Sequence, residues 1–136
     1  MNILRWGLAL LLAAFLIFMG MQKFGGPNPI FSYIAQSTGM ALFEPGVRML
    51  TGAMEITAAL LLILPRTRLY GGLLTLVVLG GALAFHLSPF LGIVAPVAFS
   101  PDGGYVKSSM LFVMAVSFFV AALALVFVER LEKKPS

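Results

Sequence analysis

The stretch GVRMLTGAMEITAALLLILP, residues 46–65, decides the fold of this chain. It is long and apolar enough to cross a membrane, because a bilayer core of about 30 Å needs about 20 helical residues. The same stretch also carries Arg48 and Glu55. A spanning helix with both charges needs one face that is turned away from lipid.

The rest of the chain has the same character. Of its 136 residues, 60% are hydrophobic and 10% are charged, which exceeds the apolar share of a typical soluble domain. The first apolar run has no cleavage site behind it, so we expect a retained helix rather than a signal peptide. The sequence predicts an all-α integral membrane four-helix bundle in a single domain, residues 1–136. The four expected spans are residues 4–23, 46–64, 69–88 and 109–128.

The basic residues favour one orientation in the membrane. Six of the nine fall on the side of the spans that holds both chain termini. Cytoplasmic loops carry the excess of lysine and arginine, so both termini are expected in the cytoplasm and the protein in the inner cell membrane, as a multi-pass protein. The basic residues form no stripe with stacking aromatics, which argues against a nucleic-acid partner and leaves membrane lipid as the surrounding.

The first outer loop carries the signals of a short helix. In residues 25–39, Asn28 can cap the start, Pro29 suits the first helical position and Gly39 suits the left-handed residue after the end. We expect this helix to lie in the outer interface of the membrane.

The second outer loop is too short to span but too apolar to be an ordinary linker. Residues 90–99, FLGIVAPVAF, are interrupted by Pro96. We expect an interfacial or re-entrant cover, which ends at the turn PDGG, residues 101–104.

Glu55 is the residue least expected in such a chain. Counted from Pro65 at about 1.5 Å per residue, it lies about 15 Å deep, near the membrane midplane. An acidic group there costs about 2.5 to 3.5 kcal/mol, so it needs a partner, a proton or water. Arg48 lies seven residues earlier on the same helix face, and Thr51 lies between the two on that face.

Other spans supply cations at the depth of Arg48. Lys23 ends the first span, and His86 lies near the outer end of the third. We expect a polar pocket in the outer half of the bundle, with Glu55 at its floor and Lys23, Arg48 and His86 around its mouth.

Each of these residues also has a structural interpretation. Glu55 could be a structural ion-pair partner, and Arg48 and Lys23 could extend to lipid headgroups. His86 could be an ordinary hydrogen-bonding residue. With one histidine and no cysteine in the chain, we expect no metal site, and no catalytic residue is assigned.

Three segments on successive spans form a recognisable set: FMGMQKF at residues 18–24, RMLTGAMEITAALLLILPR at residues 48–66 and GGALAFHL at residues 80–87. Together they resemble the DoxX-like family of small four-helix membrane proteins. Their order and spacing on successive spans carry the resemblance, which covers roughly the first two thirds of the chain.

The resemblance implies a redox association. Some members of the family are similar to membrane subunits of a thiosulfate:quinone oxidoreductase, and others are associated with membrane redox complexes. The family's lysine, Gly-x-x-Glu and histidine positions fall on Lys23, on Gly52 with Glu55, and on His86. This chain has no cysteine, so we do not expect it to catalyse sulfur or other redox chemistry alone.

Three hypotheses of different classes follow. The first is the membrane subunit of a redox-linked complex, which binds a quinone or another small amphiphile in the pocket and relays protons through Glu55. A protein partner would supply the electrons, and no covalent cofactor is expected. The second is a non-catalytic assembly or stability factor for another membrane protein, in which Glu55 pairs internally with Lys23 or Arg48. The third, ranked last, is small-solute or proton transport by a homo-oligomer, since no broken helices or inverted repeat are visible.

Overall fold

A computed structural model describes residues 2–133 of the chain. Its elements in chain order are α1 (Asn2–Gln22), α2 (Pro29–Thr38), the 3-10 helix η1 (Ala41–Phe43), α3 (Gly46–Ile63), α4 (Arg68–His86), β1 (Ala95–Phe99), β2 (Tyr105–Ser108) and α5 (Met110–Lys133). Four of the described helices, α1, α3, α4 and α5, are long and apolar enough to cross a membrane. The predicted multi-pass bundle, with a short helix between the first two spans, is therefore confirmed.

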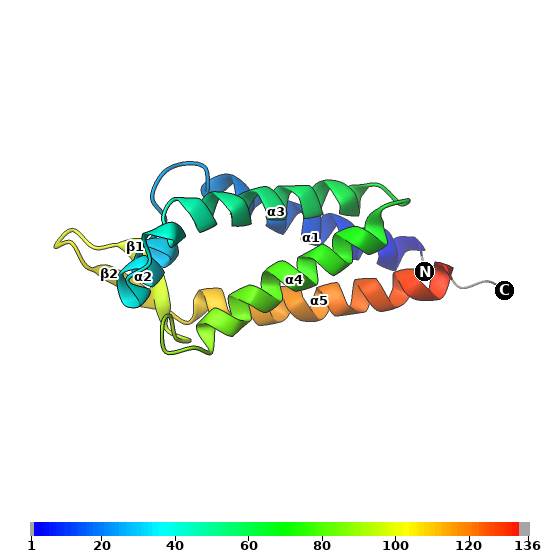
Figure 1. The fold of residues 1–136 in the computed structure, drawn as a ribbon. Helices are drawn as coiled ribbons and strands as arrows, with labels where there is room; N and C mark the ends of the chain where they lie inside the picture. The colour runs from blue at the N-terminus through cyan, green and yellow to red at the C-terminus, as the bar shows by residue number, and fades with distance from the viewer. Residues whose placement is uncertain (1, 134–136) are drawn as a thin grey trace.

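The four long helices surround a common axis. α1 packs against α3 and α5, and α4 packs against the same two helices, so α1 and α4 lie across the bundle from each other. The start of α1 and the end of α5 lie at one end of the bundle, which we call the terminal end. α2 and the hairpin of β1 and β2 lie at the other, which we call the hairpin end (Figure 1). The placement of the terminal end in the cytoplasm stays a prediction.

The packed core lies mainly in the terminal half of the bundle. It is built from small and branched apolar side chains of three spans: Ala9, Leu12, Ala13, Leu16, Ala58, Ala59, Leu62, Ala122 and Leu125. The outer faces of the same helices expose large apolar side chains, among them Leu10, Leu60 and Phe127. Such a large exposed apolar surface is suited to lipid, because its exposure to water is unfavourable in free energy.

A pair of glycines brings α1 and α3 together. A Cβ atom on Gly52 would lie 3.0 Å from the Cβ atom of Lys23 and 3.1 Å from the carbonyl oxygen of Gly20. A Cβ atom on Gly20 would in turn lie 2.9 Å from Cγ1 of Ile56. Small residues at such crossings let the backbones of membrane helices approach closely. The crossing places the end of α1 beside the middle of α3, where Glu55 lies.

The capping signals of the first loop define α2 as expected. The side chain of Asn28 accepts a hydrogen bond from the backbone N–H of Ile30 at 3.0 Å, and Pro29 is the first helical residue. Gly39 ends the helix in the left-handed conformation, with φ of 72°. The short helix predicted within residues 25–39 is confirmed, whereas its position relative to a membrane interface stays a prediction.

The second loop contains a hairpin that was not predicted. β1 and β2 pair antiparallel, from Ala95 opposite Ser108 to Phe99 opposite Tyr105. The register shifts just after Pro96, which has no N–H to donate to a continuous ladder. The turn expected at residues 101–104 joins the two strands.

Candidate functional site

A cavity of about 250 Å³ lies between the spans in the hairpin half of the bundle. Side chains of α1, α3, α4 and α5 line it, and α2 closes it from the hairpin end with Ile30, Phe31 and Ile34. Most of its lining is apolar. The polar residues of its described lining are Lys23, Thr51, Glu55 and His86.

Lys23 and Glu55 form a buried ion pair on the α1–α3 side of the cavity. Nζ of Lys23 lies 2.7 Å from Oε1 of Glu55 and donates to the carbonyl oxygen of Met19 at 3.3 Å. Their side chains are 9% and 5% exposed. Within residues 2–133, Glu55 Oε1 accepts no aligned hydrogen bond, so the contact with Lys23 is electrostatic. Thr51, one turn before Glu55, donates its hydroxyl proton to the carbonyl oxygen of Val47 at 2.8 Å.

His86 reaches the cavity from α4, across from this pair. Its Nδ1 atom lies 3.0 Å from the carbonyl oxygen of Gly92. A carbonyl oxygen can only accept, so Nδ1 carries the proton, and in the neutral ring Nε2 is left as an acceptor. Gly92 has φ of 85°, a conformation that favours glycine and turns its carbonyl back toward α4. The loop after α4 thus fixes the tautomer of His86.

Arg48 does not lie among the residues that line the cavity. Its guanidinium donates to the carboxylate of Glu44 and to the backbone carbonyl of Lys23. Glu44 also accepts from the backbone N–H of Asn28 at 3.0 Å. Arg48 therefore connects the start of α3 to the end of α1 and, through Glu44, to the start of α2. Of the five predicted site residues, the structure brings Lys23, Thr51, Glu55 and His86 to one cavity and leaves Arg48 outside it.

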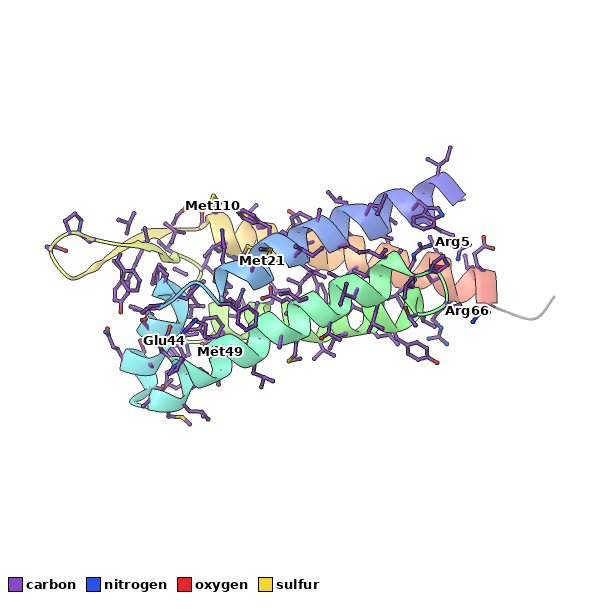
Figure 2. The ribbon with its side chains drawn as sticks, turned by 90° about the horizontal axis from the view of Figure 1, so that it is seen from above. Arg5, Met21, Glu44, Met49, Arg66 and Met110 are labelled. Carbon is purple, nitrogen blue, oxygen red and sulfur yellow. The ribbon has the colours of Figure 1, made fainter. Side chains whose placement is uncertain are left out.

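A second group of charges lies at the terminal end, where Figure 2 places Arg5 and Arg66, far from Glu44. Glu129 of α5 is completely buried and accepts hydrogen bonds from Arg5 of α1 at 2.9 and 3.2 Å. Nη1 of Arg68, on α4, lies 3.5 Å from the same carboxylate. The group joins three spans, and we call Arg5, Arg68 and Glu129 the terminal charge cluster.

Arg68 is the most constrained member of the terminal charge cluster. Its Nε donates to the carbonyl oxygen of Leu62 at 2.9 Å, and its guanidinium lies 4.2 Å from the centroid of the Trp6 ring. From the sequence, Arg5 and Arg68 count only among the basic residues that indicate orientation, and the last expected span, residues 109–128, ends just before Glu129. The signal that could have revealed the cluster is that acidic residue, which continues the apolar face of α5 by one helical turn.

Comparisons with family models, with curated proteins and with solved structures found no match to this chain. In the part of the chain that the structure describes, no three histidine, cysteine, aspartate or glutamate residues gather as metal ligands would. The candidate site is therefore defined by its own geometry. It is an apolar cavity among four spans, with a buried ion pair on one side and an oriented histidine on the other.

Proposed function

We propose that this protein binds a small amphiphile in the cavity, with a quinone as the ligand class, as the membrane subunit of a redox-linked complex. The observation that carries the proposal is the meeting of Lys23, Thr51, Glu55 and His86 at one apolar cavity. An apolar cavity of about 150 Å³ already holds benzene, so about 250 Å³ has room for a substituted ring.

The polar residues suit the chemistry of such a ligand. The ammonium group of Lys23 has three N–H donors. One donates to the carbonyl oxygen of Met19, and the group lies 2.7 Å from Oε1 of Glu55 without an aligned hydrogen bond. A remaining N–H can hold a quinone oxygen. Reduction of a quinone consumes protons, which a carboxylate such as Glu55 can pass on. The electrons would come from a protein partner, because a chain without cysteine has no thiol couple of its own.

The resemblance of residues 18–24, 48–66 and 80–87 to the DoxX-like family supports the redox association. We also propose that the terminal end faces the cytoplasm, as the distribution of basic residues favours, so that the cavity lies in the outer half of an inner membrane.

Titration of the purified protein in lipid nanodiscs with a short-chain alkyl quinone tests the binding. We expect Glu55→Gln and His86→Ala each to weaken binding about tenfold, as the loss of one hydrogen bond to a charged or oriented group would. Glu132→Gln is the matched control, because it makes the same chemical change at the terminal end, far from the cavity. Unchanged affinity in both cavity variants would remove the cavity from the account.

A non-catalytic assembly or stability factor is the second candidate, and the Lys23–Glu55 ion pair favours it. That function needs no ligand, and it requires Glu55 to have an internal partner, as it has here at 2.7 Å. Gentle extraction from the membrane distinguishes the two candidates. A protein partner in fixed ratio with no bound amphiphile supports assembly, and a bound amphiphile supports the ligand-binding subunit.

A further inference from the structure

Two residues of the cavity lining lie on the outer surface of α4. Within the described chain, Val77 and Gly81 line the cavity and are also exposed, Val77 to 62%. They are one helical turn apart. A Cβ atom built on Gly81 would meet no other atom within 4 Å, so the helix surface is open there. The outer face of a spanning helix meets acyl chains, so the cavity communicates with lipid at Val77 and Gly81.

The direction of this opening follows from two neighbouring glycines. A Cβ atom on Gly71 would lie 2.7 Å from the backbone nitrogen of Leu62 on α3, and one on Gly72 would lie 2.8 Å from Val126 on α5. Successive residues are turned by about 100° around the axis of α4. Ten residues after Gly71, Gly81 therefore points about 80° from it around that axis, on the side opposite to Gly72. The opening therefore lies on the α3 flank of α4. Figure 1 shows α3 and α4 close together at their connecting turn and well apart toward the hairpin end.

The polar groups of the cavity constrain the head group of its ligand. His86 presents Nε2 as an acceptor, because Nδ1 is committed to Gly92. Glu55 presents carboxylate oxygens, which are acceptors when ionised. Only Lys23 retains a free donor. A carbonyl oxygen on the ligand can satisfy Lys23 alone, whereas a hydroxyl group can accept from Lys23 and donate to His86 or Glu55.

We infer that the cavity takes a hydroxyl-bearing amphiphile, such as a hydroquinone or another phenol with an apolar tail, directly from the lipid through the opening at Val77 and Gly81. This inference rests on the proposed function and specifies its ligand and route. The hydroxyl group donates to Nε2 of His86 or to Glu55 and accepts from Lys23. The tail leaves between α3 and α4 and lies among the acyl chains.

The route is tested by closing the opening. Gly81→Phe places a ring over it, and Leu73→Phe is the matched control on the same helix, because Leu73 is 43% exposed and does not line the cavity. The probe is a short-chain alkylhydroquinone added to protein in nanodiscs, followed by its fluorescence. We expect Gly81→Phe to slow association about tenfold and Leu73→Phe to leave the rate unchanged.

A smaller side chain separates a blocked opening from a damaged fold. Gly81→Ala adds only a methyl group in open space, so it should slow association far less than Gly81→Phe, while both variants keep the melting temperature of the unmodified protein. Equal association rates in Gly81→Phe, Leu73→Phe and the unmodified protein would overturn the lateral route.

The head group is tested with three probes that share one ring and tail. They are the alkylhydroquinone, its quinone and its dimethyl ether, which keeps the oxygens but has no hydroxyl donor. We expect the hydroquinone to bind about tenfold more tightly than either of the others, and His86→Ala to reduce this preference. Equal binding of all three overturns the hydroxyl inference and leaves the proposed amphiphile binding standing. No binding of any probe contradicts the proposed function itself.

Discussion

Lys23 and Glu55 each depend on the other to remain inside the bundle. Both are buried, and the distance of 2.7 Å between Nζ and Oε1 is the shortest contact that either charged group makes. Removing one partner of a buried pair leaves a charge with nothing to balance it, which costs far more than the intact pair contributes. The ion pair is therefore a position of high sensitivity, whichever ligand the cavity holds.

Replacing the lysine should reveal this dependence. We expect Lys23→Met to lower the free energy of unfolding by about 3 to 5 kcal/mol, because Glu55 then lies unpaired in the bundle interior. Lys107→Met is the control. Lys107 donates to the hydroxyl of Tyr33 at an exposed position, and its loss should cost less than about 1 kcal/mol. Thermal unfolding in detergent measures both, and similar melting temperatures for the two variants would contradict the account.

The positions of single site residues could be predicted where helical spacing fixes the face and the depth at which a residue lies. Thr51 and Glu55 share a face of one helix, and Lys23 and His86 end two different spans at a similar depth. The partner of Arg48 was not predicted, because Glu44 lies before α3 begins and reaches Arg48 only through the path of the connecting chain. The mostly apolar lining was not predicted either, since it depends on how α2 closes the cavity.

At the level of helices, the crossing of α3 and α4 depends on Gly71, where the absence of a side chain lets the two backbones approach closely. A Cβ atom on Gly71 would lie 2.7 Å from the backbone nitrogen of Leu62 and 3.0 Å from the carbonyl oxygen of Ala58. Neither backbone atom can move without shifting α3. We expect Gly71→Ala to destabilise the bundle by about 1 to 3 kcal/mol, the usual cost of overpacking.

Gly81→Ala is the matched control for this prediction. It makes the same substitution on the same helix, where no atom lies within 4 Å of the new Cβ position. Alanine is the better helix former, so this variant should be as stable as the unmodified protein or slightly more stable. If chemical unfolding in micelles ranks Gly71→Ala level with Gly81→Ala, close approach of the backbones is not what sets the crossing.

The hairpin turn should respond to acid. Hydrogen bonds from the side chain of Ser100 and the backbone N–H of Gly104 lower the pKa of the Asp102 carboxyl below its usual value of 3.8. A lowered pKa in the folded state means that ionised Asp102 stabilises the turn above the unfolded pKa, and that this contribution is lost as the pH falls through the folded pKa.

An NMR titration of the Gly104 amide signal measures the effect. We expect its midpoint below pH 3.8, and we expect Asp102→Asn to abolish the titration while the hairpin is retained. A midpoint at or above 3.8 would show that the carboxylate gains nothing from its neighbours in the turn.

The two loops show why one element was predictable and the other was not. α2 carries its own start and stop signals in Asn28 and Gly39, so local chemistry was enough. The hairpin has an Asp-Gly pair at its turn, a known hairpin signal, but Pro96 and the short strands obscure it. β1 also relies on tertiary packing, since Ala95 is buried with Ile34 of α2 and Leu91.

Across the whole molecule, the two ends of the bundle have different roles. The terminal charge cluster joins α1, α4 and α5, and the packed core lies in the same half. The hairpin half instead contains the cavity and its opening to lipid. The terminal half thus holds the spans together, and the hairpin half leaves room between them.

Glu129→Gln tests the stabilising role of the terminal end. The buried guanidinium of Arg68 and the partly buried guanidinium of Arg5 would lose their shared carboxylate, so we expect a loss of about 3 to 5 kcal/mol in stability. Glu132 lies nearly one helical turn after Glu129, and its side chain is 40% exposed, 3.9 Å from Arg5. Because an exposed ion pair contributes little, Glu132→Gln should cost less than about 1 kcal/mol. Equal thermal stability of the two variants would show that the cluster does not hold the spans together.

The sequence was sufficient to predict four spans and the gathering of polar residues in one half of the bundle. It could not reveal the size of the cavity or its lateral opening. Both depend on the angle at which α4 departs from α3 beyond Gly71, and that angle is set by contacts between residues far apart in the chain. The resemblance to the DoxX-like family and the quinone ligand stay predictions.

The central claim, that the cavity holds an amphiphile, is tested most directly by native mass spectrometry of the protein extracted from its membrane with its surrounding lipid. The comparison is with Ala82→Phe, which fills the cavity from α4, and with Leu73→Phe as the control outside it. The account predicts one bound small amphiphile on the unmodified protein and on Leu73→Phe, and none on Ala82→Phe. An unmodified protein without a bound amphiphile, or the same occupancy in Ala82→Phe, would contradict it.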